Sequence, residues 1–146
     1  MLVIASGNAG KVREFGHLLA GLPITVQPQP AGLEVEETGD NFAQNAHLKA
    51  RAAALATGQW ALADDSGLEV SALGGAPGVH SARYADSDGA RISRLLRELE
   101  QANQRQRREG RVADRTARFS VALAVADPSG TIRLEVEGHC PGEILT

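Results

Sequence analysis

Apolar residues follow two different periods along the chain, and the change of period predicts where strands and helices lie. The run at 2–6 (LVIAS) is rich in β-branched residues and stops at a glycine, as buried strands do. From Lys11 the apolar positions recur every three to four residues until Gly21 and Pro23, which is the pattern of a helix. The amino-terminal part therefore predicts a strand followed by a helix.

The middle of the chain continues this alternation. A short strand is expected at 24–30, where prolines interrupt it. Asp40 is the expected N-cap of an alanine-rich helix over 42–58, which a glycine closes. Three further segments follow in order: a strand at 60–63, a turn at 64–67 (DDSG) and an extended stretch at 68–73.

The carboxyl half changes character. A Gly/Pro-rich loop at 73–86 is long enough to suggest function, and an amphipathic helix follows at 90–102. A polar connector at 104–117 leads to two strands, 119–127 and 131–138, which form a predicted hairpin. Strands and helices alternate in the first part of the chain, and two strands pair near its end. This order predicts an α/β fold with a mixed sheet flanked by helices, in one domain over 1–146.

Composition narrows the classes of protein. The chain has 146 residues, 42% of them hydrophobic, which suits a globular protein with a real core. A net charge of −3 argues against a protein that coats nucleic acid. The single cysteine excludes an intrachain disulfide, and no run is long enough to span a membrane or to act as a signal peptide. These features favour a cytoplasmic protein.

The first candidate for chemistry is the stretch S6-G7-N8-A9-G10-K11, between the first strand and the first helix. Backbone N–H groups at a helix N-terminus bind phosphate oxygens, and a lysine one turn later adds positive charge. The spacing matches neither a Walker loop nor GxGxxG. A tight turn with a solvated lysine is the alternative.

The second candidate is the acidic stretch 36–40 (EETGD), which precedes a helix. Acidic residues there stabilise the helix macrodipole, and that explains most such clusters. On the helix, Asn45 and Lys49 are four residues apart and share one face. The lysine is therefore placed either to pair with the acidic stretch or to hold an anion.

The third candidate is the adjacent pair Asp64 and Asp65, whose like charges need compensation. Side chains of neighbouring residues in a strand point to opposite faces, but a turn would relax that constraint. With Glu37, the pair could hold Mg²⁺, and one aspartate could activate a water. A polar turn completed by Ser66 is the alternative.

The order of these stretches resembles the inosine/xanthosine triphosphate pyrophosphatase family. The segments that carry the resemblance are, in order, SGNAGKVREF, EETGDNFAQNAHLKA, ALADDSGLEVSALGGAPGVHSARYA and EGHCPGEI. The resemblance implies an elongated α/β molecule with a mixed sheet and a cleft between two lobes, usually a homodimer. It also implies hydrolysis of non-standard purine nucleoside triphosphates (ITP, dITP, XTP) to a monophosphate and pyrophosphate, with Mg²⁺.

The resemblance implies roles for particular residues. Asp65 would be the base that activates water and would also touch the metal, with Glu37 and Asp64 as further metal ligands. Lys49 and Ser66 would contact the substrate. The triphosphate would be cradled by Ser6, Gly7, Asn8, Ala9, Gly10 and Lys11.

The chain also departs from that family. Family members continue beyond PGEILT with segments that recognise the purine base, and those segments are not in these residues. We therefore expect the triphosphate and metal half of the site, and expect apolar surface to be exposed where the missing segment packs.

Three alternatives remain open at this point. The chain could be a Maf-type nucleotide pyrophosphatase, or a truncated form that binds nucleotide and metal without turnover. The arginine-rich stretch 105–118 could instead bind nucleic acid, although nearby acidic residues dilute its charge, and we expect no stable nucleic-acid binding.

Overall fold

The computed structural model describes residues 1–145, apart from the side chains of residues 82 and 83, so the last residue of the predicted domain lies outside it. The chain divides into two compact units. The first contains Met1–Asp65 and Ala122–Glu137, and the second contains Ser66–Val121 and the residues from Gly138 onward.

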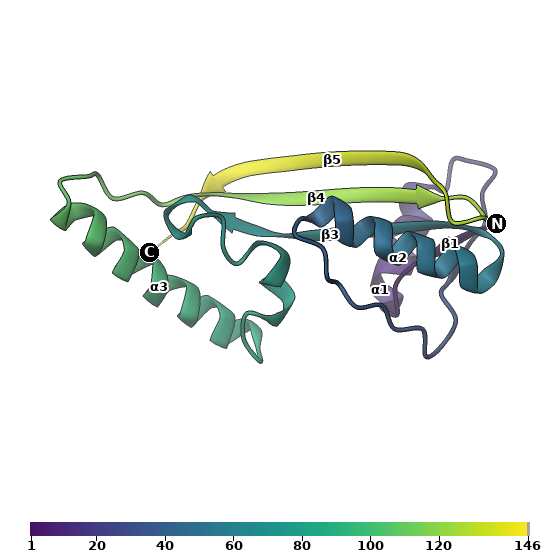
Figure 1. Cartoon of the computed structure of the whole chain (residues 1–146), viewed down its shortest axis with the longest axis horizontal. Coiled ribbons are helices and arrows are strands. Elements are labelled where there is room, and N and C mark those ends of the chain that lie inside the picture. The colour runs from purple at the N-terminus through teal and green to yellow at the C-terminus, as the bar shows by residue number, and fades with distance from the viewer. Residues whose placement is uncertain (146) are drawn as a thin grey trace. The chain divides into compact units, whose positions relative to one another are not determined.

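Five strands form one sheet in the order β2-β1-β3-β4-β5. Figure 1 labels four of them, β1, β3, β4 and β5. The elements in chain order are β1 (Leu2–Ile4), α1 (Ala9–Leu18), β2 (Val26–Pro28), α2 (Phe42–Thr57), β3 (Trp60–Val70), two short 3₁₀ helices (Ser71–Leu73 and Gly78–Arg83), α3 (Asp88–Arg108), β4 (Thr116–Ala126) and β5 (Ile132–Glu143). The predicted α/β fold with a mixed sheet and flanking helices is confirmed.

The first unit is built on three parallel strands. β1 pairs in parallel with β2 on one side and with β3 on the other. The chain crosses from β1 to β2 through α1 and then returns past β1 to β3 through α2. Since parallel crossovers are right-handed, the two opposite directions of travel put α1 and α2 on opposite faces of the sheet.

The face under α2 is packed with alanine. Ala61 and Ala63 of β3 are almost fully buried, as are Ala122, Ala124 and Ala126 of β4. The alanines of α2 that face them are Ala46, Ala50, Ala53 and Ala54, and all four have no exposed surface. Small side chains on both sides let the helix approach the sheet closely, so α2 is held firmly over this face.

The β4–β5 turn is held by one carboxylate. Asp127 Oδ1 accepts hydrogen bonds from the Ser129 N–H (2.9 Å), the Ser129 hydroxyl (2.6 Å) and the Thr131 N–H (3.1 Å), and Oδ2 accepts one from Arg133 Nε (2.7 Å). These donors favour the ionised form and hold the pKa of Asp127 well below its usual range, with the Ser129 hydroxyl as the largest cause. The hairpin predicted around this turn is confirmed.

The second unit has a core of its own. Val70, Leu99 and Ala117 are buried together, and partly buried residues such as Leu95 and Ile144 pack against them. On its surface, Glu98 accepts hydrogen bonds from the Tyr84 hydroxyl and from Arg94 Nε. Burial, followed by that bond to Glu98, raises the pKa of Tyr84 to about 12.

Several local predictions need correction. The expected turn at 64–67 is wrong, because β3 runs unbroken from Trp60 to Val70. The N-cap of α2 is Asn41 rather than Asp40, since the Asn41 side chain accepts from the Gln44 N–H. α3 extends to Arg108, so the predicted polar connector begins as helix. Among the described residues, no helix is long and apolar enough to cross a bilayer.

Candidate functional site

The strand order of the first unit predicts where a ligand would bind. The chain reverses its direction of travel at β1, between β2 and β3, and open α/β sheets bind ligands beyond the carboxyl ends of the strands at such a point. Ile4, the last residue of β1, pairs with Leu62 of β3. The stretch Ser6–Lys11 and the pair Asp64–Asp65 both follow directly, so two predicted site segments meet at this edge.

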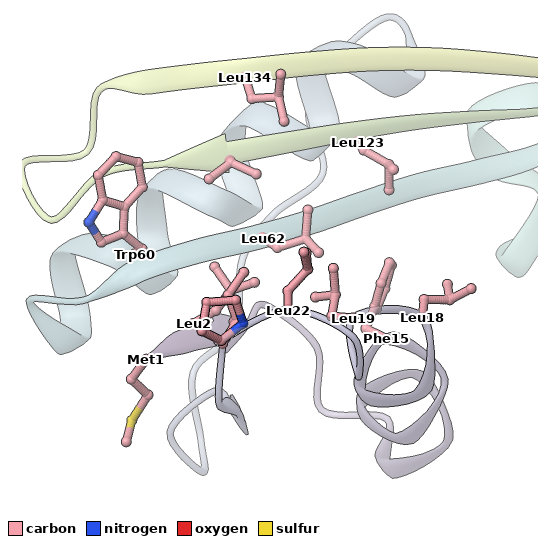
Figure 2. Close-up of a pocket in the computed structure, with 13 residues that line it drawn as sticks. Met1, Leu2, Phe15, Leu18, Leu19, Leu22, Trp60, Leu62, Leu123 and Leu134 are labelled. Atoms are coloured by element: carbon pink, nitrogen blue, oxygen red, sulfur yellow. The ribbon is translucent and has the colours of Figure 1, made fainter.

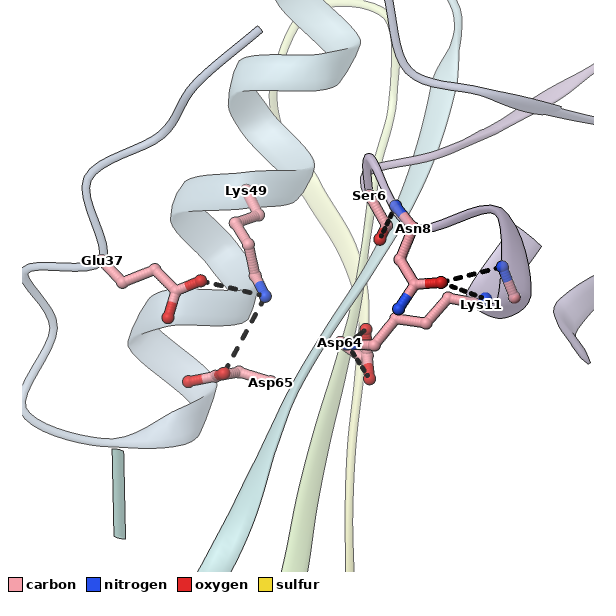
Figure 3. Close-up of polar contacts among 8 residues, drawn as sticks. Ser6, Asn8, Lys11, Glu37, Lys49, Asp64 and Asp65 are labelled. Carbon is pink, nitrogen blue, oxygen red and sulfur yellow. Dashed lines mark hydrogen bonds and ion pairs between the residues drawn. The ribbon is translucent and has the colours of Figure 1, made fainter. Parts of the chain in front are cut away.

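Asp65 lies on the α2 side of β3, where Figure 3 shows it facing Lys49 of that helix. Two residues of α2 hold it. Asn45 Nδ2 donates a hydrogen bond to Asp65 Oδ2 (3.1 Å), and Lys49 Nζ lies 3.9 Å from Oδ1. Lys49 Nζ also lies 3.5 Å from Glu37 Oε1. Asp65 is only 7% exposed and the Lys49 side chain 15%, so the ammonium group pairs with two carboxylates in a partly dry environment.

Asn45 connects this cluster to the acidic loop. Its Oδ1 accepts a hydrogen bond from the Gly39 N–H (2.8 Å), while its Nδ2 holds Asp65. The loop passes so close to the helix that a Cβ on Gly39 would lie 2.6 Å from Gln44 Cβ and 2.7 Å from Asn45 Oδ1. Only glycine fits there, so the loop that carries Glu37 is fixed against the start of α2.

Asp64 points to the other face of β3, toward α1. Lys11 Nζ lies 3.1 Å from its Oδ1 and 3.2 Å from its Oδ2 (Figure 3). The two adjacent aspartates are therefore compensated separately, by Lys11 on one face and by Lys49 on the other. This arrangement explains how the chain tolerates two neighbouring carboxylates within a strand.

The stretch Ser6–Lys11 forms a capped helix start. Asn8 Oδ1 accepts from the N–H groups of Gly10 (2.8 Å) and Lys11 (3.4 Å), and Ser6 Oγ accepts from the Asn8 N–H (3.0 Å). Gly7, Asn8 and Ala9 are exposed. Side chains thus accept from three N–H groups of this turn, those of Asn8, Gly10 and Lys11, and an anion bound by these three would have to replace those acceptors.

The structure separates the three carboxylates predicted to hold Mg²⁺. Glu37 and Asp65 converge on Lys49 on the α2 side, whereas Asp64 lies on the α1 side. Within residues 1–145, no three acidic, histidine or cysteine side chains gather so as to share a metal ion. Two carboxylates still suit Mg²⁺, which commonly binds one or two of them together with substrate phosphates. Ser66, the next residue of β3, is exposed and belongs to the second unit.

The sequence predicts no role for two residues of this site. It places Asn45 on the same helix face as Lys49, and Gly39 within an acidic stretch. An asparagine four residues before a lysine indicates only that the two share a helix face, and Asn45 proves to be buried. Its two partners come from a loop and from a strand, so their identity depends on the tertiary structure.

Proteins of known structure or activity are similar to this chain over nearly its whole length. The dITP/XTP pyrophosphatase of Synechococcus sp. (strain CC9311) is 62% identical over 144 residues, which are 99% of this chain and 65% of that protein. The dITP/XTP pyrophosphatase of Prochlorococcus marinus (strain MIT 9313) is 60% identical over 99% of this chain and 66% of its own length. This chain therefore spans slightly less than two thirds of the length of either relative.

Solved Ham1 structures are similar to this chain, and a family profile matches it. A HAM1 protein from Coxiella burnetii superimposes with a TM-score of 0.87 at 41% identity, over 98% of this chain and 72% of that one. The Ham1 protein of Staphylococcus aureus gives a TM-score of 0.81 at 39% identity, over 99% and 71% of the two chains. Residues 2–146 match the profile of the Ham1 family. The predicted family is confirmed: the chain belongs to the Ham1 family.

Proposed function

We propose that this chain hydrolyses non-standard purine nucleoside triphosphates, such as dITP and XTP, to the monophosphate and pyrophosphate. The observation that carries the proposal is Asp65, which Asn45 holds by one oxygen and which shares Lys49 with Glu37. The Synechococcus and Prochlorococcus relatives are dITP/XTP pyrophosphatases, and this supports the choice of substrate.

In the proposed reaction, Asp65 acts as the general base. Its carboxylate takes a proton from a water molecule whose oxygen attacks the α-phosphorus. The bond between the α-phosphorus and the α–β bridging oxygen breaks, and its electron pair leaves with pyrophosphate. Asn45 fixes the rotation of the carboxylate through the 3.1 Å hydrogen bond, so the base is oriented before the substrate arrives.

Positive charge at this edge of the sheet offsets the charge of the leaving group. Lys11 and Lys49 lie on the two sides of β3, and each is paired with an aspartate in the free protein. Glu37 and Asp65 would hold Mg²⁺, which when bound supplies further charge for the phosphate oxygens. The turn Ser6–Lys11 would receive the triphosphate, and Ser66 would contact the substrate, as the resemblance implies.

The covered length sets the scope of the proposal. The chain spans 65% and 66% of the lengths of the Synechococcus and Prochlorococcus relatives, so about a third of each relative has no counterpart in these residues. Binding of nucleotide and metal without turnover is the competing proposal, and this covered length is the observation that favours it.

We further propose that the protein is a cytoplasmic homodimer that does not bind nucleic acid stably. The one cysteine of the chain, Cys140, is exposed and free.

The first test is incubation of the 146-residue chain with dITP and MgCl₂, followed by separate assays for pyrophosphate and orthophosphate. Pyrophosphate that depends on Mg²⁺, with little product from dGTP, supports the proposal. Orthophosphate would mean cleavage at the terminal phosphate and would overturn it. Turnover of pyrimidine nucleotides in preference to dITP would favour a Maf-type activity instead.

A second test separates turnover from binding. Asp65→Asn should lower the rate at least about a hundredfold, because general-base catalysis typically contributes that much, and should leave Mg²⁺-dependent nucleotide binding in place. Glu14→Gln, an exposed carboxylate on α1, is the matched control and should change neither. Binding without turnover in the unmodified chain would favour the binding-only proposal.

A further inference from the structure

The face of the first unit opposite α2 carries large apolar side chains. Alternation along a strand puts Trp60 and Leu62 of β3 on this face, while Ala61 and Ala63 point to α2. β4 repeats the pattern, with Leu123 beside the buried alanines that flank it. The helix on this side, α1, covers the face only in part.

The uncovered part is a groove of about 610 Å³ (Figure 2). α1 and the chain after it supply one wall through Phe15, Leu18 and Leu22, and the strands supply the other. Several of its side chains are well exposed: Leu18 is 70% exposed, Trp60 44% and Leu134 56%. Every residue that lines the groove within the described chain is apolar.

The chemistry of the groove argues against a small-molecule site. Such sites place several polar groups among apolar ones to fix the orientation of the ligand. Among the described lining residues, the indole N–H of Trp60 is the one polar side-chain group. Contiguous exposed apolar surface of this kind marks a place where other protein surface packs. β5, which carries Leu134, is also an edge strand of the sheet, and edge strands are usually covered or blunted.

The relatives indicate what the covering surface is. About a third of the Synechococcus relative, and about a third of the Prochlorococcus one, has no counterpart in these residues. We propose that this groove is the docking surface for that remaining third, a polypeptide segment that buries its own apolar side chains against Leu18, Trp60 and Leu134. The proposal concerns packing and does not depend on hydrolysis. Since Leu62 is two residues from Asp64 on the same face, the docked segment lies beside the Lys11–Asp64 pair.

The test uses the tryptophan of the chain as its reporter. Trp60 is the one tryptophan in the sequence and lines the groove. The part of the Synechococcus relative outside the matched 144 residues, with its own tryptophans, if any, replaced by phenylalanine, is prepared as a separate polypeptide and titrated into the 146-residue chain. We expect saturable binding that shifts the Trp60 emission to shorter wavelength and lowers its quenching by acrylamide.

Two variants locate the binding. Leu18→Glu and Leu134→Glu put a charge on exposed groove positions, so both should fold and both should weaken binding at least about tenfold. Val112→Glu, at an 88% exposed position in the second unit, is the matched control and should bind as the unmodified chain does.

Other outcomes would overturn the proposal. Binding that is unchanged in both groove variants would place the segment elsewhere. A blue shift of Trp60 that grows with the concentration of the chain alone, together with a dimer in sedimentation velocity, would assign the groove to a second copy. No binding at all, with the circular dichroism of both polypeptides showing folded structure, would remove the segment as the occupant.

Discussion

Asn45 Nδ2 donates to Asp65 Oδ2 at 3.1 Å while Asn45 Oδ1 accepts from the Gly39 N–H at 2.8 Å. One buried amide thus joins a helix, a strand and a loop, and both of its hydrogen-bonding ends are used. Asn45 touches no reacting atom in the proposed reaction, so it is a positioning residue.

Removal of the Asn45 amide should cost both stability and turnover. Asn45→Ala leaves the Gly39 N–H without this acceptor and removes a donor from Asp65, so the free energy of unfolding should fall by about 1–3 kcal/mol. The proposed turnover should fall in kcat more than it changes KM, because the base loses its orientation. Urea denaturation and steady-state kinetics with dITP measure the two effects.

The control for this variant is Gln44→Ala. Gln44 is exposed and accepts from the Asp40 N–H, so its loss should lower stability slightly and leave kcat unchanged. Equal losses of kcat in both variants would mean that Asn45 acts only by stabilising the start of α2.

A methyl group at Gly39 should displace the acidic loop. Its Cβ would lie 2.6 Å from Gln44 Cβ and 2.7 Å from Asn45 Oδ1, so Gly39→Ala should lower the free energy of unfolding by about 1–3 kcal/mol. Gly21→Ala is the control, since no atom lies within 4 Å of its Cβ position. Denaturation curves of the two variants check this, and a Gly39→Ala curve that matches the unmodified protein would contradict the packing described.

The Lys11–Asp64 pair should contribute modestly to stability. Lys11 is partly exposed, and solvent-exposed pairs typically couple by 1 kcal/mol or less, so a double-mutant cycle should give about 0.5–1 kcal/mol. The variants are Lys11→Met, Asp64→Asn and the double variant. If Lys11 also meets the triphosphate, Lys11→Met should raise KM for dITP, whereas an unchanged KM would limit the residue to the ion pair.

Acid should weaken the β4–β5 hairpin through Asp127. The folded-state pKa of this carboxyl lies below its ordinary value of 3.8, so its ionised form stabilises the fold above that value. The contribution is lost as the pH falls from about 4 through the folded-state pKa, because the unfolded state then binds the proton first.

Asp127→Asn provides the comparison. The difference in free energy of unfolding between the unmodified chain and Asp127→Asn should be constant from pH 7 to about pH 5 and should shrink below pH 4. Urea denaturation across this range measures it. A difference that is constant to pH 3 would show that the turn does not depend on the charge of Asp127.

Sequence periodicity determined much of the fold. Local patterns predict three of its features: the alternation of strands and helices, the alanine-rich helix closed by Gly58, and the hairpin around Asp127. They can do so because backbone hydrogen bonding and capping act over a few residues. The sequence also predicted that Lys49 could pair with the acidic stretch, and Lys49 does contact Glu37. It grouped Glu37 with both Asp64 and Asp65, but only Asp65 shares Lys49 with Glu37.

Only the tertiary structure decided which face of β3 each of the two aspartates occupies. Whether Asp64 and Asp65 lie in a turn or in a strand cannot be read from DDSG alone, since a continuous β3 requires pairing with distant strands. That pairing sends the two carboxylates to opposite faces and gives each its own lysine. The role of Asn45 and the open apolar groove depend in the same way on contacts between segments far apart in the chain, which no local pattern records.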